Sequence, residues 1–307
     1  MDPGVEATGV RRSFGPVHAV RDISLTAHPG EVTALVGPNG AGKTTLLLML
    51  ATLLVPDAGS IRIAGHYPVS EPEAVRRRMG WTPDVFGVYD NLTAGEYLRF
   101  FGAAYRLGAD ESRRRSAELL ELARLSEFAD APVHVLSRGQ KQRLGLVRAL
   151  VHRPSVLLLD EPASGLDPLS RVELRSLLRR LADDGKTVIV SSHILADLEE
   201  TADRVVFIDD GRTVGEHRMA DLPRSARRTW RIKSLDVTAL LAALDARGLP
   251  HGGPAPAGVD IELASEEAAA GLLASLVGAG VPVSALAPAG GALEAAYLRL
   301  TEPEALQ

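Results

Sequence analysis

Glycine, lysine and hydroxyl side chains near residue 40 occur at a spacing that suits phosphate binding. Residues 37–44 read GPNGAGKT, so four residues separate two glycines, and Lys43 and Thr44 follow the second. In loops of this pattern the backbone N–H groups surround phosphate oxygens, the lysine reaches the β and γ phosphates, and the threonine hydroxyl binds Mg²⁺. The apolar run Val32–Val36 precedes the loop and a helical pattern follows it. Because a phosphate loop joins a strand to a helix, the sequence predicts a nucleotide site here.

Two acidic residues end a second apolar run. The run Val156–Leu159 is short and continuous, as in a strand buried within a parallel sheet, and Asp160 and Glu161 follow it. Ligands of open α/β folds bind at the carboxyl ends of such strands. There Asp160 would hold Mg²⁺ through water, and Glu161 would orient or deprotonate an attacking water. Together with the phosphate loop, these carboxylates predict ATP hydrolysis.

A serine and a glutamine stand at the spacing of a helix-capping box. Ser137 and Gln140 predict a helix that Ser137 caps and that runs from Arg138 to about His152. The exposed N–H groups at the start of this helix, with the Ser137 hydroxyl, would form an anion site. An ordinary capped amphipathic helix is the alternative. The place of the motif between the phosphate loop and the acidic strand favours the anion site.

The order of these motifs resembles that in the ATP-binding subunits of ATP-binding-cassette (ABC) transporters. Residues 136–140, LSRGQ, are similar to the signature sequence of that family. In the family, the signature of one subunit covers the γ-phosphate that the other subunit holds. The resemblance therefore implies a homodimer with ATP and Mg²⁺ as cofactors, in which Ser137, Gly139 and Gln140 reach the partner's nucleotide. The residues of the phosphate loop expected to bind ATP are Gly37, Pro38, Asn39, Gly40, Ala41, Gly42, Lys43, Thr44 and Thr45.

The resemblance also assigns residues outside these motifs. Phe14 is similar to the aromatic residue that stacks on adenine, and Val20 to the small apolar residue beside it. For both, a plain role in the hydrophobic core is the alternative. His193 follows an apolar strand expected at residues 187–190 and is similar to the histidine that contacts the γ-phosphate and steadies the attacking water. Residues 164–167 are similar to a loop that lies at the dimer interface.

Two residues depart from the family pattern. Asp84 stands where glutamine is usual, and an ionised carboxylate can bind Mg²⁺ or its water but cannot donate a hydrogen bond. Arg138 stands where the common signature has glycine, and it would either point outward or add positive charge near the partner's nucleotide. Both changes are similar to one branch of ATPases, which pair with exporter-type permeases for drugs, antibiotics and sodium. The Mg²⁺ ligands expected are Thr44, Asp160 and Asp84.

Composition excludes several classes of protein. The 307 residues are 46% hydrophobic and 24% charged, which suits one large and one small domain with substantial cores. The sequence has no uninterrupted run of about twenty apolar residues that could span a bilayer, and the N-terminal residues lack the apolar core of an export signal. The absence of cysteine excludes disulfides, cysteine-ligated zinc and thiol catalysis. A cytoplasmic location is expected.

Charge argues against broad binding to nucleic acid. The formal net charge is −5, and nucleic-acid-binding domains are usually basic. Two short runs, Arg76–Arg78 and Arg113–Arg115, are the local exceptions. They predict solvated helix faces, with contact to phospholipid head groups or to a membrane partner as the alternative.

Alternating strand and helix patterns predict an α/β fold. We expect a P-loop NTPase cassette with a parallel sheet core and a helical insertion, then a small C-terminal α+β domain that could be ferredoxin-like. The Asp210-Gly211 pair predicts a hairpin. The expected domains are the ATPase domain 1–216, with its core at 1–84 and 153–216 and its helical subdomain at 85–152, and the accessory domain 217–307, which ends in an amphipathic helix at 293–300.

The resemblance implies a function for the whole chain. We expect an ATP-hydrolysing subunit of an exporter, bound to the inner face of the cell membrane and driving a separate permease that contacts residues 85–152. A soluble cassette ATPase of translation or DNA maintenance is the alternative, but the paired cassettes, coiled-coil insertion or zinc modules usual in such proteins are missing. A nucleotide sensor that does not hydrolyse ATP is a third option, and the intact Glu161 and His193 argue against it. The cargo is not encoded in these residues.

Overall fold

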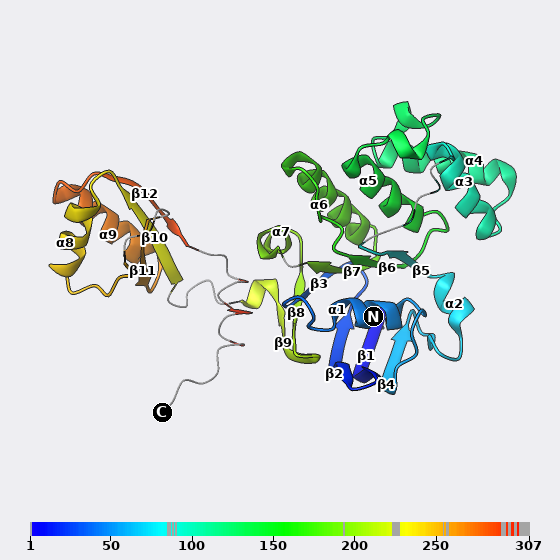
Figure 1. Ribbon diagram of the computed structural model, residues 1–307, viewed down its shortest axis with the longest axis horizontal. Helices are drawn as coiled ribbons and strands as arrows, with labels where there is room; N and C mark the ends of the chain where they lie inside the picture. The colour runs from blue at the N-terminus through cyan, green and yellow to red at the C-terminus, as the bar shows by residue number, and fades with distance from the viewer. Residues whose placement is uncertain are drawn as a thin grey trace. The chain divides into compact units, whose positions relative to one another are not determined.

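The computed structural model describes most of the chain. The described residues are 2–84, 87, 89, 91–192, 194–222, 228–253, 255, 258–289, 293, 296, 297 and 300. They form two compact units, residues 1–220 and 221–307 (Figure 1). The finer division expected from the sequence, with a boundary at 216/217, stays a prediction. Among the described residues, no helix is long and apolar enough to cross a membrane.

The first unit is built on a mixed sheet. Its described strands lie in the order β4-β1-β2-β9-β8-β3-β7-β6-β5. Neighbours from β8 to β5 are parallel, so the expected parallel core is confirmed. At the other end, β1 is antiparallel to β2 and β4, a pairing that was not expected from the sequence. The strands are β1 (Val5–Phe14), β2 (Val17–Ala27), β3 (Val32–Val36), β4 (Ala58–Ile63), β5 (Met79–Thr82), β6 (Val156–Asp160), β7 (Thr187–Ser192), β8 (Arg204–Asp209) and β9 (Arg212–Arg218).

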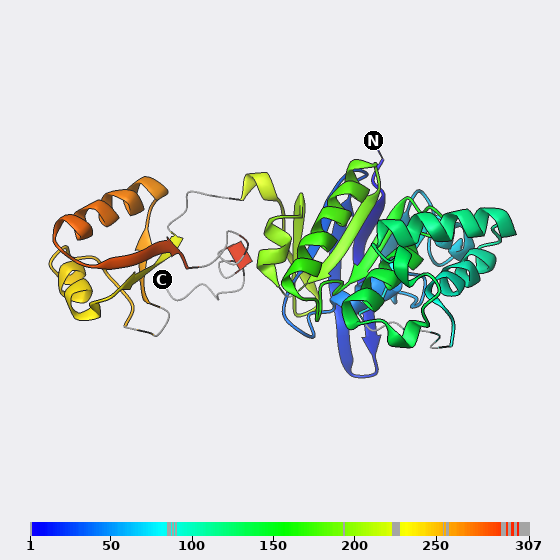
Figure 2. The ribbon, with the colours of Figure 1, turned by 90° about the horizontal axis from the view of Figure 1, so that it is seen from above.

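Helices cover both faces of the parallel core. Helix α1 packs on β2 and β6, and α6 packs on β3 and β7, from opposite sides of the sheet (Figures 1 and 2). Strands β3 and β6 are buried along their whole length, as expected for strands covered on both faces. Asp167 caps α6 by accepting a hydrogen bond from the Ser170 N–H. The helices of this layer are α1 (Lys43–Leu50), α2 (Pro72–Arg76), α6 (Pro168–Asp183) and α7 (Leu195–Glu199).

A helical subdomain follows β5 along the chain. It contains α3 (Ala94–Ala104), α4 (Ala109–Leu122) and α5 (Arg138–Ala149), which pack on one another (Figure 1). Two capping boxes start its helices, one from Thr93 and Glu96 and one from Ser137 and Gln140. The box of Ser137 and Gln140 was expected from the sequence. Since these boxes satisfy the first N–H groups of α3 and α5, they fix where each helix begins.

The second unit has its own hydrophobic core. Strand β10 (Arg228–Ser234) lies between β11 (Val259–Leu263) and β12 (Val283–Pro288) and is antiparallel to both. Helices α8 (Val237–Asp245) and α9 (Glu266–Gly278) contribute residues such as Leu240 and Leu276 to a core with Trp230. His251 forms an isolated bridge to Ile261 of β11, where a ferredoxin-like fold has the second of its four strands. The ferredoxin-like assignment stays a prediction. The amphipathic helix expected at 293–300 lies largely outside the described residues.

Candidate nucleotide site

The phosphate loop leaves β3 and enters α1. A single capping residue, Gly42, precedes the helix with φ +100°, and no side chain caps it. Among the described residues, no carbonyl accepts a hydrogen bond from the N–H groups of residues 42–45. These donors therefore face outward at the positive end of α1, where an anion is stabilised. The arrangement fits a phosphate group.

Lys43 provides a buried cation inside this loop. Its side chain is 7% exposed, and its Nζ donates hydrogen bonds to the Gly37 carbonyl at 2.7 Å and the Pro38 carbonyl at 3.0 Å. Burial lowers the pKa of Lys43, while the nearby carboxylates of Glu161 and Asp160 raise it. The loop thus holds an ammonium group between its own carbonyls and the acidic pair. A phosphate group bound in the loop would gain a charge-assisted hydrogen bond from this ammonium group.

Two glycines of the loop are required by close backbone contacts. A Cβ at Gly37 would lie 2.0 Å from the Ile208 carbonyl oxygen, and one at Gly42 would lie 2.5 Å from the Ala19 carbonyl oxygen. By contrast, Gly40 has φ +85°, and a Cβ added there would meet nothing within 4 Å. Gly37 and Gly42 therefore seat the loop against the sheet, whereas Gly40 serves the backbone turn alone.

Asp160 and Glu161 share one hydroxyl group. Asp160 ends β6 and is 2% exposed. Its Oδ1 accepts a hydrogen bond of 2.6 Å from the Ser191 hydroxyl, and the same Ser191 Oγ accepts a bond of 3.0 Å from the Glu161 N–H. Glu161 has φ +47°, a conformation that costs free energy in a residue other than glycine and that occurs at functional sites. Ser191 was not expected from the sequence, because its contact with Asp160 depends on the pairing of β7 with β6.

The expected Mg²⁺ ligands do not form a protein cage. Thr44 is exposed at the start of α1, and Asp84 is exposed just after β5. Strand β5 is parallel to β6, so Asp84 and Asp160 follow the same edge of the sheet. Among the described residues, no cluster of three or more acidic or histidine side chains could hold a metal. Since Mg²⁺ often takes one or two protein ligands and completes its shell with phosphate and water, Thr44 and Asp160 fit a metal that enters with the nucleotide.

Phe14 and Val20 lie in different environments. Phe14 ends β1 with 45% of its surface exposed, and the Arg12 guanidinium lies 4.9 Å from its ring centroid. Val20 is 1% exposed and lies next to Gly42: its Cγ2 is 3.4 Å from the position that a Cβ of Gly42 would occupy. An exposed ring suits stacking on a base, whereas Val20 has the burial of a core residue that supports the loop.

Helix α5, called the signature helix because it begins within residues 136–140, has its capping box at its N-terminal end. The Ser137 Oγ accepts a bond of 3.3 Å from the Gln140 N–H, and Gln140 Oε1 accepts one of 2.7 Å from the Ser137 N–H. Gly139 faces the start of α6, since a Cβ there would lie 3.4 Å from the Ser170 Oγ. His193, expected to contact the γ-phosphate, lies outside the described residues. Its neighbour Ser192 accepts a hydrogen bond from the Ile194 N–H at 3.0 Å.

Comparison with known proteins identifies the family. The ABC transporter family profile matches residues 20–164. The Nod factor export ATP-binding protein I of Ralstonia nicotianae is 37% identical over 226 residues, which cover 72% of this chain and 70% of the relative. The chain belongs to the ABC transporter ATPases. This ABC ATPase is also 35% identical to the linearmycin resistance ATP-binding protein LnrL of Bacillus subtilis, with 71% and 70% of the two chains covered. It is 37% identical to the daunorubicin/doxorubicin resistance ATP-binding protein DrrA of Streptomyces peucetius, with 72% of this chain and 67% of the relative covered.

Solved structures agree on the fold of the ABC cassette. An ATP-binding subunit of an ABC transporter superposes with a TM-score of 0.66 at 31% identity, covering 72% of this chain and 92% of that one. A dimeric bacterial ABC transporter cassette gives a TM-score of 0.64 at 27% identity, over 70% and 98% of the two chains. A related dimer holds ADP and phosphate after hydrolysis, with a TM-score of 0.63 at 28% identity over 70% and 98% of the chains.

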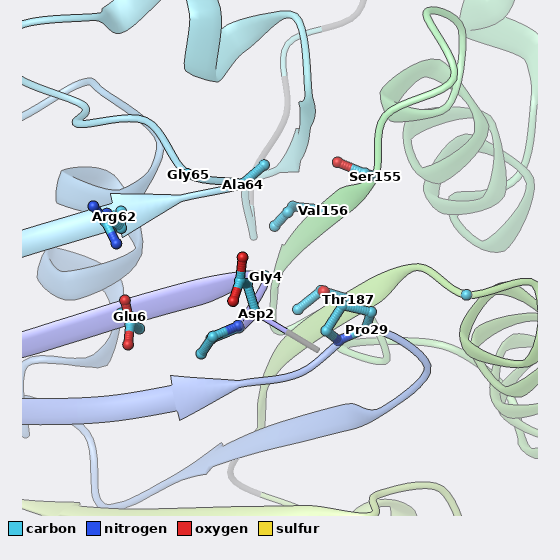
Figure 3. Close-up of a pocket in the computed structure, with 12 residues that line it drawn as sticks. Asp2, Gly4, Glu6, Pro29, Arg62, Ala64, Gly65, Ser155, Val156 and Thr187 are labelled. Carbon is cyan, nitrogen blue, oxygen red and sulfur yellow. The ribbon is translucent and has the colours of Figure 1, made fainter.

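A cavity of about 400 Å³ in this ABC ATPase lies away from the nucleotide site. Figure 3 shows Ser155, Val156 and Thr187 around it. Val156 and Thr187 begin β6 and β7, so the cavity lies at the amino ends of the strands whose carboxyl ends carry Asp160 and Ser191. Glu6 and Arg62 of the same cavity face each other across β1 and β4. The size of this cavity therefore says nothing about nucleotide binding.

Proposed function

We propose that this chain binds and hydrolyses ATP as the nucleotide-binding subunit of an exporter. The observation that carries the proposal is the buried Lys43 ammonium beside the acidic pair, at a helix start whose N–H groups face outward. ATP supplies the phosphoanhydride bond, and its phosphate oxygens would accept hydrogen bonds from Lys43 and from the N–H groups at the start of α1. Mg²⁺ would lie between these phosphates and the carboxylates. Lys43 binds the β and γ phosphates, while Thr44 and Asp160 bind Mg²⁺, Asp160 through a water molecule.

Glu161 acts as the general base in this proposal. Its backbone N–H is fixed by Ser191, so its carboxylate is held at the edge of the sheet where the γ-phosphate would lie. His193 positions the γ-phosphate and the attacking water, as the family resemblance implies. Asp84 completes the group near the metal, where its carboxylate would contact Mg²⁺ or a bound water. Phe14 stacks on the adenine with its exposed ring and Val20 supports it.

Two copies of the chain would form each complete site. Ser137, Gly139 and Gln140 of one copy would cover the γ-phosphate in the other, because the capped start of α5 offers a hydroxyl and a positive helix end. The dimeric cassette among the structural relatives supports this arrangement. Closure of the dimer on ATP and its release after hydrolysis would then drive transport.

A membrane permease is the proposed partner. The helical subdomain exposes aromatic side chains that a monomer usually buries: Tyr89 and Phe100 are 53% and 48% exposed, with ring centroids 5.2 Å apart. Aromatic side chains are enriched where proteins bind one another. The export and drug-resistance roles named for the relatives favour an exporter. The subunit would thus lie on the inner face of the cell membrane, with residues 1–216 as the ATPase domain and 217–307 as an accessory domain.

The Glu161→Gln variant tests both levels of the proposal. With MgATP, this variant should form a stable dimer on size exclusion with light scattering, and wild type should hydrolyse ATP and remain mainly monomeric. Tagged Glu161→Gln protein should also recover a polytopic membrane protein from gently solubilised native membranes. A variant that turns over ATP at the wild-type rate would exclude Glu161 as the base. Recovery of ribosomes or DNA would support the alternative, a soluble ATPase of translation or DNA maintenance.

A further inference from the structure

Arg138 occupies the first turn of the signature helix without a polar partner. It is the first residue of α5, directly after the capping Ser137, and its side chain is exposed. Among the described residues, no hydrogen bond or ion pair is formed by its guanidinium. The sequence left two roles open for Arg138, an outward position or added charge near the partner's nucleotide. The structure shows a third arrangement.

The guanidinium of Arg138 lies flat against Gly165. A Cβ at Gly165 would stand 2.3 Å from Cζ, 2.4 Å from Nε and 2.6 Å from Nη2 of Arg138. These three atoms belong to one planar group, so a face of the guanidinium lies beside Gly165, which is itself exposed. Gly165 has φ +69°, a left-handed conformation that favours glycine at this position.

Gly165 belongs to the loop that follows Glu161. The Ser164 N–H donates a hydrogen bond of 2.9 Å to the Glu161 carbonyl, which closes a turn between the acid and Gly165. At the other end of the loop, Asp167 caps α6 through the Ser170 N–H at 3.0 Å. The loop is therefore short and held at both ends. A displacement at Gly165 would be transmitted to the backbone of Glu161.

We propose that Arg138 is a positioning residue for Glu161. Its guanidinium holds the loop 161–167 against the signature helix of the same chain. When that helix docks on the partner's nucleotide, the contact fixes the loop and places the Glu161 carboxylate of its own site. Nucleotide binding at the partner's site would therefore affect the position of Glu161 in this chain's own site, through the contact between Arg138 and Gly165. This inference rests on the proposed function, in which the signature completes a site in the partner copy.

Steady-state ATP hydrolysis by three variants tests the inference. Arg138→Lys keeps the charge but loses the planar group, and Arg138→Gln loses the charge. A misplacement of about 1 Å in a catalytic group can lower the rate about a hundredfold. Because a smaller displacement of Glu161 is expected here, both variants should lower kcat by about tenfold. The KM for ATP should stay within about twofold of the wild-type value, since neither variant changes an ATP contact of the same site. Gly165→Ala places a methyl group where the guanidinium lies and should lower kcat in the same way. The double variant of Gly165→Ala and Arg138→Lys should lower kcat no more than the worse of the two single variants, because both substitutions remove the same contact.

Two controls separate this role from the others. Gly185→Ala introduces the same left-handed strain at φ +85° but meets nothing within 4 Å, so its kcat should match wild type. In a Glu161→Gln background, Arg138→Lys and Arg138→Gln should leave the ATP concentration for half-maximal dimer formation unchanged, because the group they position is gone. A shift in that concentration for Arg138→Gln, with normal activity in Arg138→Lys, would overturn the inference and indicate an anion contact. Additive losses with Gly165→Ala would overturn it as well.

The proposed function can fail independently of this inference. Wild type that does not hydrolyse ATP, or a Glu161→Gln protein that does not dimerise with MgATP, would contradict the function itself. Normal wild-type turnover with unchanged kcat in every Arg138 and Gly165 variant would overturn the positioning role alone.

Discussion

The Ser191 hydroxyl donates a hydrogen bond of 2.6 Å to Asp160 and accepts one of 3.0 Å from the Glu161 N–H. One side chain on β7 thus fixes both acids that end β6. Ser191 itself is fully buried, so water cannot replace it readily. A buried residue of the neighbouring strand therefore orients the proposed metal ligand and the backbone of the proposed base.

Ser191→Ala should reduce turnover more than ATP binding. The substitution leaves the buried Asp160 oxygen without its donor, and an unsatisfied buried group costs about 1–3 kcal/mol of stability. Because Glu161 also loses an anchor, we expect kcat to fall by about tenfold while nucleotide affinity changes less. Ser155→Ala is the matched control, since the Ser155 hydroxyl lies at the opposite end of β6 and makes only a long bond of 3.4 Å to the Arg78 carbonyl. Equal turnover in the two variants would refute the role of Ser191.

The phosphate-loop glycines should differ sharply in their tolerance of alanine. Gly37→Ala drives a methyl group onto the Ile208 carbonyl, and we expect a loss of about 3 kcal/mol or more in the free energy of unfolding. Gly40→Ala meets no neighbouring atom and should cost about 1 kcal/mol for its left-handed backbone. Chemical denaturation of the two variants without nucleotide measures the difference. Similar costs would show that the loop relaxes away from β8.

His152 should make stability depend on pH in the acidic range. Its Nε2 lies 3.1 Å from the Met79 carbonyl and its ring stacks on Tyr105, and burial lowers its pKa from 6.5 to about 4. Below pH 6.5 the unfolded chain gains a proton that the folded chain does not. Stability is therefore fully present above the unfolded pKa and declines as the pH falls toward 4, by on the order of 2 kcal/mol.

His152→Phe tests this dependence, because phenylalanine can stack on Tyr105 but does not titrate. The difference in unfolding free energy between wild type and variant should change with pH between 6.5 and about 4, in favour of the variant at low pH. A constant difference across this range would mean that His152 titrates normally in the folded protein.

Each of the two compact units contains one of the two tryptophans. Trp81 lies on β5 and Trp230 on β10. Because a ligand stabilises the unit that binds it, MgATP should raise the unfolding midpoint reported by Trp81. The midpoint reported by Trp230 should not change, since its core is separate. Fluorescence of Trp81→Phe and Trp230→Phe proteins isolates each signal, and equal shifts in both would show that the units unfold together.

Local patterns predicted much of the fold because local contacts determine those elements. The capping box at Ser137 and the Asp210-Gly211 hairpin between β8 and β9 were predicted correctly, and Asp210 and Gly211 have positive φ values of 43° and 73°. The antiparallel pairing of β1 with β2 and β4 was not, because pairing direction depends on contacts distant in sequence. Strand β12 was missed, since four of its six residues are serine, alanine or proline.

The same division applies to the site. Lys43 and Asp160 follow from motifs whose spacing carries the chemistry. The buried hydroxyl of Ser191 and the packing of Arg138 on Gly165 depend on neighbouring strands and loops, so no spacing in the sequence reveals them. Asp84 was found only as a departure from a family pattern, and in the structure it follows the same sheet edge as Asp160.

The central claim is that Ser137 of one chain completes the site of another. The most direct test mixes two inactive variants. Lys43→Ala removes the phosphate-binding ammonium, and Ser137→Asp preserves the helix cap but places a negative charge against the γ-phosphate. A mixed dimer has one intact site if the signature acts between chains. Equal amounts of the two proteins should then recover about a quarter of wild-type ATP turnover, since half the dimers are mixed and half their sites are intact. Turnover no higher than that of either variant alone would contradict the account.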